Sequence, residues 1–258
     1  GGILSSWGTM DFAGGIVVHA TAGTAALVTA LTLGKRRGFP KSITPPHSPI
    51  LTMIGAAMLW VGWFGFNAGS ALGANGSAGM SMLVTHISAS TAALVWMFIE
   101  WKRFGKPSLI GVVTGMVAGL ATVTPASGYI GIPGGLILGF SGGLLCYLAV
   151  DYIRGKLLID DSLDVFAVHG VGGILGTLLV AFLATSTFSG LGLPEGQTAM
   201  SQFVVQVKAV ILTVIWTSIF TYLILKVTSL IVPLRVDEQE EIEGLDLRSH
   251  GEKGYHSD

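Results

Sequence analysis

The sequence predicts an all-α integral membrane protein, and three observations support that fold class. Of its 258 residues, 51% are hydrophobic and 11% are charged, whereas an average soluble domain has about 25% charged residues. The mean hydropathy is +0.70, and apolar stretches recur that are long enough to cross about 30 Å of hydrocarbon. Glycine supplies 37 positions, which suits membrane helices that pack closely through small residues.

Seven apolar stretches are expected to span the membrane. They cover residues 11 to 33, 50 to 72, 79 to 101, 108 to 126, 131 to 153, 163 to 185 and 200 to 232. Lys and Arg lie in the connections after the first, third and fifth stretches, and the alternate connections carry none. The positive-inside rule therefore predicts that these basic connections and the C-terminal tail face the cytoplasm.

This topology divides the chain into a transmembrane domain, residues 1–233, and a cytoplasmic tail, residues 234–258. The tail is too acidic and polar to enter the membrane. An odd number of spans, together with an outer N-terminus and no export signal ahead of the first span, leads us to expect further helices before residue 1.

The first span carries a carboxylate and an imidazole, Asp11 and His19, within DFAGGIVVHATAG at 11–23. A charged side chain near the bilayer centre costs about 3 kcal/mol or more, so such residues usually face a cavity or a partner. Eight residues turn a helix by about 80° net, which puts the two side chains on adjacent faces roughly two turns apart. Two roles stay open for Asp11, at the outer helix end: a helix cap or a contact to a ligand.

The sixth span repeats part of this pattern. VVHATAG contains His19 and AVHGVGG contains His169, and in each a glycine follows the histidine by four residues. An aspartate precedes each histidine, Asp11 by eight residues and Asp164 by five. Inverted repeats are common in transporters and put binding groups at the repeat interface, although short echoes in glycine-rich helices also arise by chance. The echo favours a facing histidine pair that titrates as a unit, whereas His86, which has no echo, is expected to be structural.

The second span ends in WVGWFGFNAGS, in which Trp63, Phe66, Asn67 and Ser70 share one helix face. Two interpretations of this face stay open. It is either an interfacial aromatic belt with polar groups that bond neighbouring helices, or a gated mouth whose aromatic rings attract a small cation and whose hydroxyl accepts a hydrogen bond.

Other chemistries are disfavoured. A net charge of −1 argues against a nucleic-acid partner, because binding to a phosphate backbone needs a concentrated basic surface. The single cysteine, Cys146, lies in an apolar run and is expected to pack as a small hydrophobe. No metal or cofactor site is expected. An intramembrane hydrolase would need an activated nucleophile, and no Ser or Cys is expected to lie in a GxSxG-like context. The three aspartates before the sixth span, Asp160, Asp161 and Asp164, are expected to cap its helix.

Over essentially its whole length the chain resembles the C-terminal two thirds of an ammonium transporter of the Amt/Mep/Rh family. The resemblance is carried by DFAGGIVVH at 11–19, GWFGFNAGS at 62–70, GKPS at 105–108, TPASGYIG at 124–131, DDSLDVFAVHGVGG at 160–173 and GLDLRSHGEKGY at 244–255. It implies a bundle of eleven transmembrane helices with inverted repeats, of which the seven spans here would be the fifth to the eleventh, assembled as a homotrimer.

The resemblance also implies roles for single residues. It matches His19 and His169 to a pore histidine pair, Phe66 to a gate phenylalanine and Trp63 to the pore lining. It matches Ser70 and Asp11 to the outer ammonium site. The other gate phenylalanine and the outer tryptophan of the family belong to helices outside this sequence.

The function that the resemblance implies is ammonium transport, not enzymatic catalysis. Ammonium would be recruited at the outer aromatic site and deprotonated there, and ammonia would pass the histidine pair. The protein would lie in the plasma (cell inner) membrane with its C-terminus in the cytoplasm, where a PII-type signalling protein is an expected partner. The alternative is an ammonium sensor of the same fold that signals through its tail.

Overall fold

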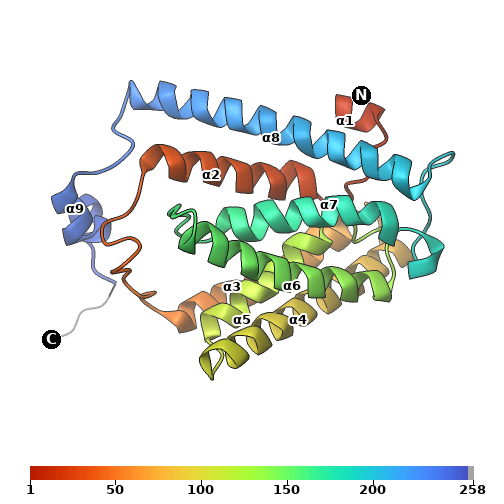
Figure 1. The fold of residues 1–258 in the computed structure, drawn as a ribbon, viewed down its shortest axis with the longest axis horizontal. Coiled ribbons are helices and arrows are strands. Elements are labelled where there is room, and N and C mark those ends of the chain that lie inside the picture. Colours follow the sequence, from red (N-terminus) through yellow and green to blue (C-terminus); the bar gives the residue numbers. More distant parts are fainter. Residues whose placement is uncertain (255–258) are drawn as a thin grey trace.

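The computed structural model describes residues 1–254, and this part of the chain is helical, with no strand among the described residues (Figure 1). Tyr255, the last residue of the C-terminal motif, lies outside the described residues. The elements are α1 (Ile3–Ser6), η1 (Gly15–Ala20), α2 (Thr21–Leu33), α3 (Pro49–Gly69), α4 (Gly76–Phe104), α5 (Leu109–Val123), α6 (Ile132–Gly155), η2 (Phe166–Gly170), α7 (Val171–Leu183), η3 (Ser186–Phe188), α8 (Ala199–Ser229), α9 (Glu238–Glu243) and η4 (Asp246–His250).

Six helices in the described part are long and apolar enough to cross a membrane, and the first of them joins η1 to α2 over Gly15–Leu33. The predicted fourth span is shorter than expected. It is α5, with 15 residues, because Pro125 follows closely and removes the backbone donor that a further turn needs. The first and sixth spans begin at Gly15 and Phe166, a few residues later than predicted, because the aspartates before them lie in the preceding turns.

Side-chain caps define where several long helices start. Ser48 accepts a hydrogen bond from the amide of Leu51, with Pro49 in the first turn of α3. Asn75 and Ser108 cap α4 and α5 in the same way. These residues satisfy backbone donors that have no partner within the helix.

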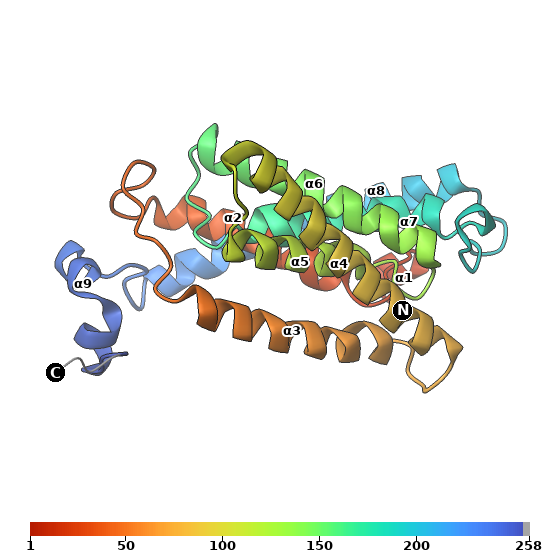
Figure 2. The same ribbon diagram turned by 90° about the horizontal axis from the view of Figure 1, so that it is seen from below.

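The bundle has a tightly packed interior and an uncovered edge. Helices α4, α5 and α6 pack against one another, and the Ser88 hydroxyl of α4 donates to the carbonyl of Gly119 in α5 at 2.8 Å. Helix α3 lies along one side (Figure 2), and most of its apolar side chains are exposed. α8 packs along α2 and α7.

The three basic connections and the tail gather at one end of the bundle, at the left in Figure 1, which we call the basic end. There Arg235 of the tail donates to the carbonyls of Leu33 and Lys35, at 3.3 and 2.8 Å. Arg36 forms an ion pair with Asp160 at 2.8 Å. The chain is therefore polarised by charge along the helix axes, as the sequence predicts.

Candidate functional site: a histidine pair beside an aromatic cavity

Two short π-helical segments carry the two histidines of the sequence echo. His19 lies in η1 and His169 in η2, each just before a regular helix, α2 or α7. The amide of His19 donates to the carbonyl of Gly14, five residues back, at 3.1 Å. Such wide turns are rare and frequently occur at functional sites.

An aspartate caps the start of each of these segments in the same way. The Asp11 carboxylate accepts from the amides of Gly15 and Ile16, at 2.6 and 3.0 Å, and Asp161 accepts from those of Val165 and Phe166, at 3.0 and 2.7 Å. Capping, one of the two roles left open for Asp11, is thus observed, and the capping role expected for Asp161 is confirmed. The same expectation is wrong for Asp160 and Asp164, whose carboxylates form ion pairs with arginines instead.

The aspartate paired with Asp11 in the sequence echo needs correction. Asp161, not Asp164, is its counterpart, because both Asp11 and Asp161 precede their histidine by eight residues and bond the amides four and five positions ahead. Asp164 instead forms an ion pair with Arg154 at 3.2 Å. The spacing of aspartate and histidine is therefore the same in the segments that carry His19 and His169.

Glycines let the two histidine-bearing segments cross in contact. A Cβ on Gly23 would meet the backbone of Gly170, and a Cβ on Gly173 would lie 2.5 Å from the Cβ of His19 and 2.8 Å from the carbonyl oxygen of Gly15. The glycines four residues after each histidine are thus required by this close approach.

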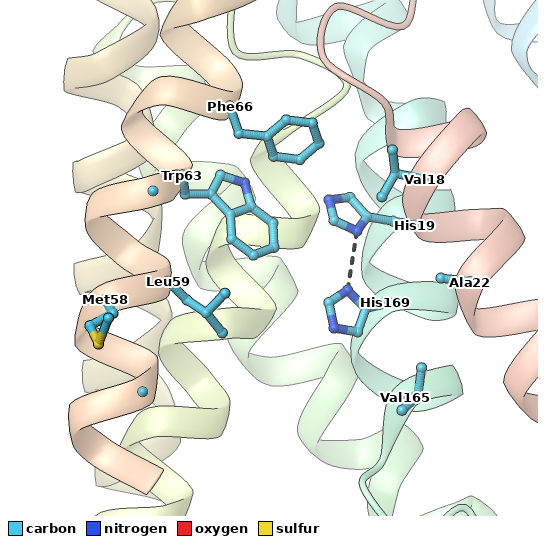
Figure 3. Close-up of a pocket in the computed structure, with 11 residues that line it drawn as sticks. Val18, His19, Ala22, Met58, Leu59, Trp63, Phe66, Val165 and His169 are labelled. Atoms are coloured by element: carbon cyan, nitrogen blue, oxygen red, sulfur yellow. Dashed lines mark hydrogen bonds between the residues drawn. The ribbon is translucent and has the colours of Figure 1, made fainter. Parts of the chain in front are cut away.

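The crossing brings the two imidazoles together, as the echo predicts. The Nδ1 atoms of His19 and His169 are 3.1 Å apart and share a hydrogen bond (Figure 3). One ring must therefore donate at Nδ1 while the other accepts. His19 is only 2% exposed, and its Nε2 is buried without a hydrogen-bond partner.

Two aromatic rings of α3 lie against the pair. The Trp63 indole stacks on the His19 ring at 5.2 Å between centroids, with 13° between the planes, and Phe66 lies edge-on at 6.0 Å. Trp63 is held in place by its Nε1, which donates to Thr124 Oγ1 at 2.9 Å. Sequence reasoning missed Thr124, which lies next to Pro125 in the TPASGYIG motif.

These side chains border a cavity of about 660 Å³. Its lining is almost wholly apolar apart from the imidazoles, and comprises Val18, His19, Ala22, Gly55, Met58, Leu59, Gly62, Trp63, Phe66, Val165 and His169 (Figure 3). Met58 and Leu59 are 71% and 55% exposed. Nothing in the described part of the chain covers that side of the cavity.

Other candidate residues lie outside this cavity. Ser70 directly follows the last residue of α3, and its hydroxyl donates to the carbonyl of Phe66 at 2.8 Å. Asn67 is fully buried and bonds Thr85 of α4 at 3.0 Å. His86 stacks on Trp60 at 5.2 Å. The described residues include no group of three or more metal-ligating side chains, and Cys146 is a buried free thiol.

The expectation that no serine lies in a GxSxG-like context is wrong for one position. GFSGG at 139–143 fits the G-x-S-x-G pattern of serine hydrolases letter by letter. Ser141 lies inside α6, however, and its hydroxyl donates to the carbonyl of Ile137 at 2.7 Å. A nucleophilic serine of that class lies on a sharp turn between a strand and a helix, so Ser141 has the wrong context.

At the basic end, the pKa values of two aspartates are shifted in opposite directions. Burial raises the pKa of Asp164 to about 6, against the opposing charge of Arg154. Burial also acts to raise the pKa of Asp160, but hydrogen bonds from the Arg36 side chain and amide outweigh it and hold that pKa below its usual value. The Arg36–Asp160 pair joins the end of α2 to the segment before η2.

Comparisons with known proteins identify the family. The chain matches the Ammonium Transporter Family model over residues 1–255. It is 47% identical to ammonium transporter Amt1 of Archaeoglobus fulgidus, over 99% of this chain and 64% of that protein. It is 46% identical to an ammonium transporter of Aquifex aeolicus, over 99% of this chain and 59% of that one. The chain therefore spans less than two thirds of the length of these relatives.

Solved structures support the same family. A structure named Sensor Amt Protein superposes with a TM-score of 0.88 at 31% identity, covering 96% of this chain and 62% of that one. Candida albicans Mep2 superposes with a TM-score of 0.81 at 33% identity, covering 93% and 55%. The chain belongs to the ammonium transporter family, a family of membrane transporters rather than enzymes.

Proposed function

We propose that the complete protein transports ammonium: it recruits the cation at an outer aromatic site, removes its proton, and passes ammonia through the cavity beside His19 and His169. The observation that carries this proposal is the 3.1 Å contact between the two Nδ1 atoms, bordered by an apolar cavity and stacked against Trp63. Membership of the ammonium transporter family supports it.

The cavity selects ammonium over potassium because removing an ion's charge from water is costly. Aromatic faces such as those of Trp63 and Phe66 attract a small cation, but an apolar lining offers a hydrated potassium ion little in exchange for its lost water. Ammonium differs from potassium because it can release a proton and continue as a neutral molecule. The same lining that excludes potassium therefore admits ammonia.

The histidine pair supplies the polar groups along this apolar route. With the Nδ1 atoms bonded to each other, each Nε2 is left free to bond a passing molecule, and the buried Nε2 of His19 has no partner in the protein. The pair therefore offers hydrogen bonds to ammonia and carries a proton between the rings. The released proton is carried separately, by the histidines and water.

The outer site uses Asp11 and Ser70 in different ways. The Asp11 carboxylate is bonded to the amides of Gly15 and Ile16, so its negative charge acts on an approaching cation through the field and through the helix start it fixes. The Ser70 hydroxyl donates within α3, which leaves its oxygen lone pairs as acceptors for ammonium.

Replacing His169 by alanine in the complete protein tests the role of the pair. We expect ammonium transport in proteoliposomes to fall, or potassium to leak through, because the substitution removes one imidazole and its shared hydrogen bond. The measurement is ammonium-induced current and potassium flux from the same vesicles. His86→Ala is the matched control, since His86 is a span histidine that stacks on Trp60 away from the cavity, and it should transport as the wild type does. Unchanged ammonium transport and potassium exclusion in the His169 variant would defeat the proposal.

The second candidate is an ammonium sensor that signals through the tail. It is favoured by the likeness to the structure named Sensor Amt Protein and by the contacts of Arg235 with the end of α2, the helix after His19. Uptake of labelled methylammonium separates the two candidates. A pure sensor binds the cation without moving it, whereas the transporter accumulates it.

Assembly and partners complete the proposal. The protein is a homotrimer in the plasma membrane, its domain of residues 1–233 spans the bilayer, and its tail lies in the cytoplasm, where a PII-type protein controls it. The charge polarity of the loops supports this orientation, and the tail's contacts at the basic end support a role in control. Cross-linking of membranes and accessibility of a tail cysteine from each side test these points.

A further inference from the structure

Two glutamines lie fully buried in α8, a helix of 31 residues that is otherwise strongly apolar. Gln202 and Gln206 are four residues apart, so their side chains share one helix face. Burying an amide is costly unless its donors and acceptor find partners. The pair therefore needs a structural or functional reason.

The Gln206 amide has four partners. Its Nε2 donates to the carbonyls of Met10 and Thr177, at 2.7 and 2.9 Å. Its Oε1 accepts from the amide of Met10 at 2.9 Å and from Nε2 of Gln202 at 3.1 Å. Both donor hydrogens and both lone pairs are used, which is the full capacity of a carboxamide.

These bonds tie together both halves of the histidine site. Met10 directly precedes Asp11, whose carboxylate caps the segment that carries His19. Thr177 lies in α7, eight residues after His169. Figure 1 shows α8 lying along α2 and α7, next to the N-terminal segment. One side chain of α8 thus holds the approach to Asp11 against the helix that follows His169.

Gln202 reinforces the same segment. Its Nε2 donates to the carbonyl of Gly8 at 3.0 Å as well as to Gln206. Residues 8–10 have no regular secondary structure, so these side-chain bonds replace the backbone ladder that would otherwise fix their position. A segment held in this way moves when the amides are removed.

We propose that Gln206 is a positioning residue for the outer ammonium site, which it serves by fixing Met10 and thereby the place and direction of the Asp11 carboxylate. This inference rests on the proposed transport function. Asp11 attracts the cation before it enters the pore, so Gln206 governs the apparent affinity for ammonium, whereas passage beyond the gate depends on other residues.

The test is Gln206→Met in the complete protein, because methionine keeps the length of the side chain and removes all four bonds. The measurement is the uptake of labelled methylammonium as a function of its concentration. The half-saturation concentration should rise about tenfold, equivalent to about 1.4 kcal/mol of binding free energy, while the maximal rate stays unchanged. Gln202→Met should give a smaller rise, because it leaves three of the Gln206 bonds in place. A purely structural role lowers the amount of folded protein and leaves half-saturation unaltered.

Thr213→Val is the matched control, since Thr213 lies on the same buried face of α8 nearer the basic end, and its uptake curve should be that of the wild type. Hydrogen exchange gives a second readout that does not need transport. The amides of Gly15 and Ile16 should exchange faster in Gln206→Met than in the wild type or in Thr213→Val. The inference is overturned if these amides exchange equally fast in Gln206→Met and in the wild type. It is also overturned if the wild type transports and Gln206→Met has the same half-saturation concentration. A wild type that does not transport overturns the proposed function, and exchange then decides the role of Gln206 alone.

Discussion

Gly173 offers a direct test of whether helix crossing sets the geometry of the histidine pair. In Gly173→Ala the new Cβ would lie 2.5 Å from the Cβ of His19 and 2.8 Å from the carbonyl oxygen of Gly15. Non-bonded carbons prefer about 3.5–4.0 Å, so the two segments must separate by roughly 1 Å. Overpacking of this kind costs about 1–3 kcal/mol.

The same displacement acts on the shared hydrogen bond. The Nδ1 atoms are 3.1 Å apart, and a separation increased by about 1 Å is beyond hydrogen-bond range. We therefore expect Gly173→Ala to lower the thermal unfolding temperature and to reduce ammonium transport about tenfold, the effect of losing one bond worth about 1.4 kcal/mol.

The assay pairs thermal unfolding in detergent with uptake in proteoliposomes. Gly65→Ala is the matched control, because its Cβ has no neighbour within 4 Å and alanine favours a helix by about 1 kcal/mol over glycine. It should keep both stability and transport. If Gly173→Ala behaved like Gly65→Ala, the close crossing would not govern the pair and the reasoning would be refuted.

Two further predictions concern the basic end. Asp164 has a pKa raised to about 6 by burial, so the folded protein binds its proton more tightly than the unfolded chain and loses stability as the pH rises from about 4 to 6. Asparagine tolerates the positive φ of 55° at this position. Asp164→Asn should therefore unfold at the wild-type temperature near pH 4 and at a higher temperature than the wild type at pH 7. An equal difference in unfolding temperature between variant and wild type at both pH values contradicts this. Arg235→Ala removes the bonds to Leu33, Lys35 and Glu241, so limited proteolysis should cut the tail several-fold faster while the unfolding temperature stays constant, and an unaltered cleavage rate would argue against docking.

The sequence predicted most of the transmembrane architecture because apolar length and loop charge are local properties. Span ends were predicted less well. α5 stops at Val123, before the predicted end at residue 126. Pro125 weakens the preceding turn locally, but the residue at which the helix ends depends on how the chain packs after the proline. The spans at Gly15 and Phe166 begin later than predicted because Asp11 and Asp161 cap from outside the helix.

The histidine contact was predictable because the pattern of histidine and glycine recurs with equal spacing. The aspartate that matches Asp11 also had a sequence signal, because Asp161 alone of the three aspartates before His169 keeps the eight-residue spacing, and its hydrogen bonds confirm the match. Thr124 and Gln206, in contrast, were missed. Each acts on a residue distant in the sequence, 61 positions away for Trp63 and 196 for Met10, and no local pattern marks such a pair.

The most direct measurement of the central claim, that His19 and His169 act as one unit in ammonium transport, is a double-mutant comparison in the complete protein. Transport is measured for His19→Ala, His169→Ala and the double variant in matched vesicles. Residues that act as a unit give strongly non-additive losses, so the double variant should transport no more slowly than the more impaired single variant. Losses that multiply would show that the two imidazoles act independently and would contradict the account.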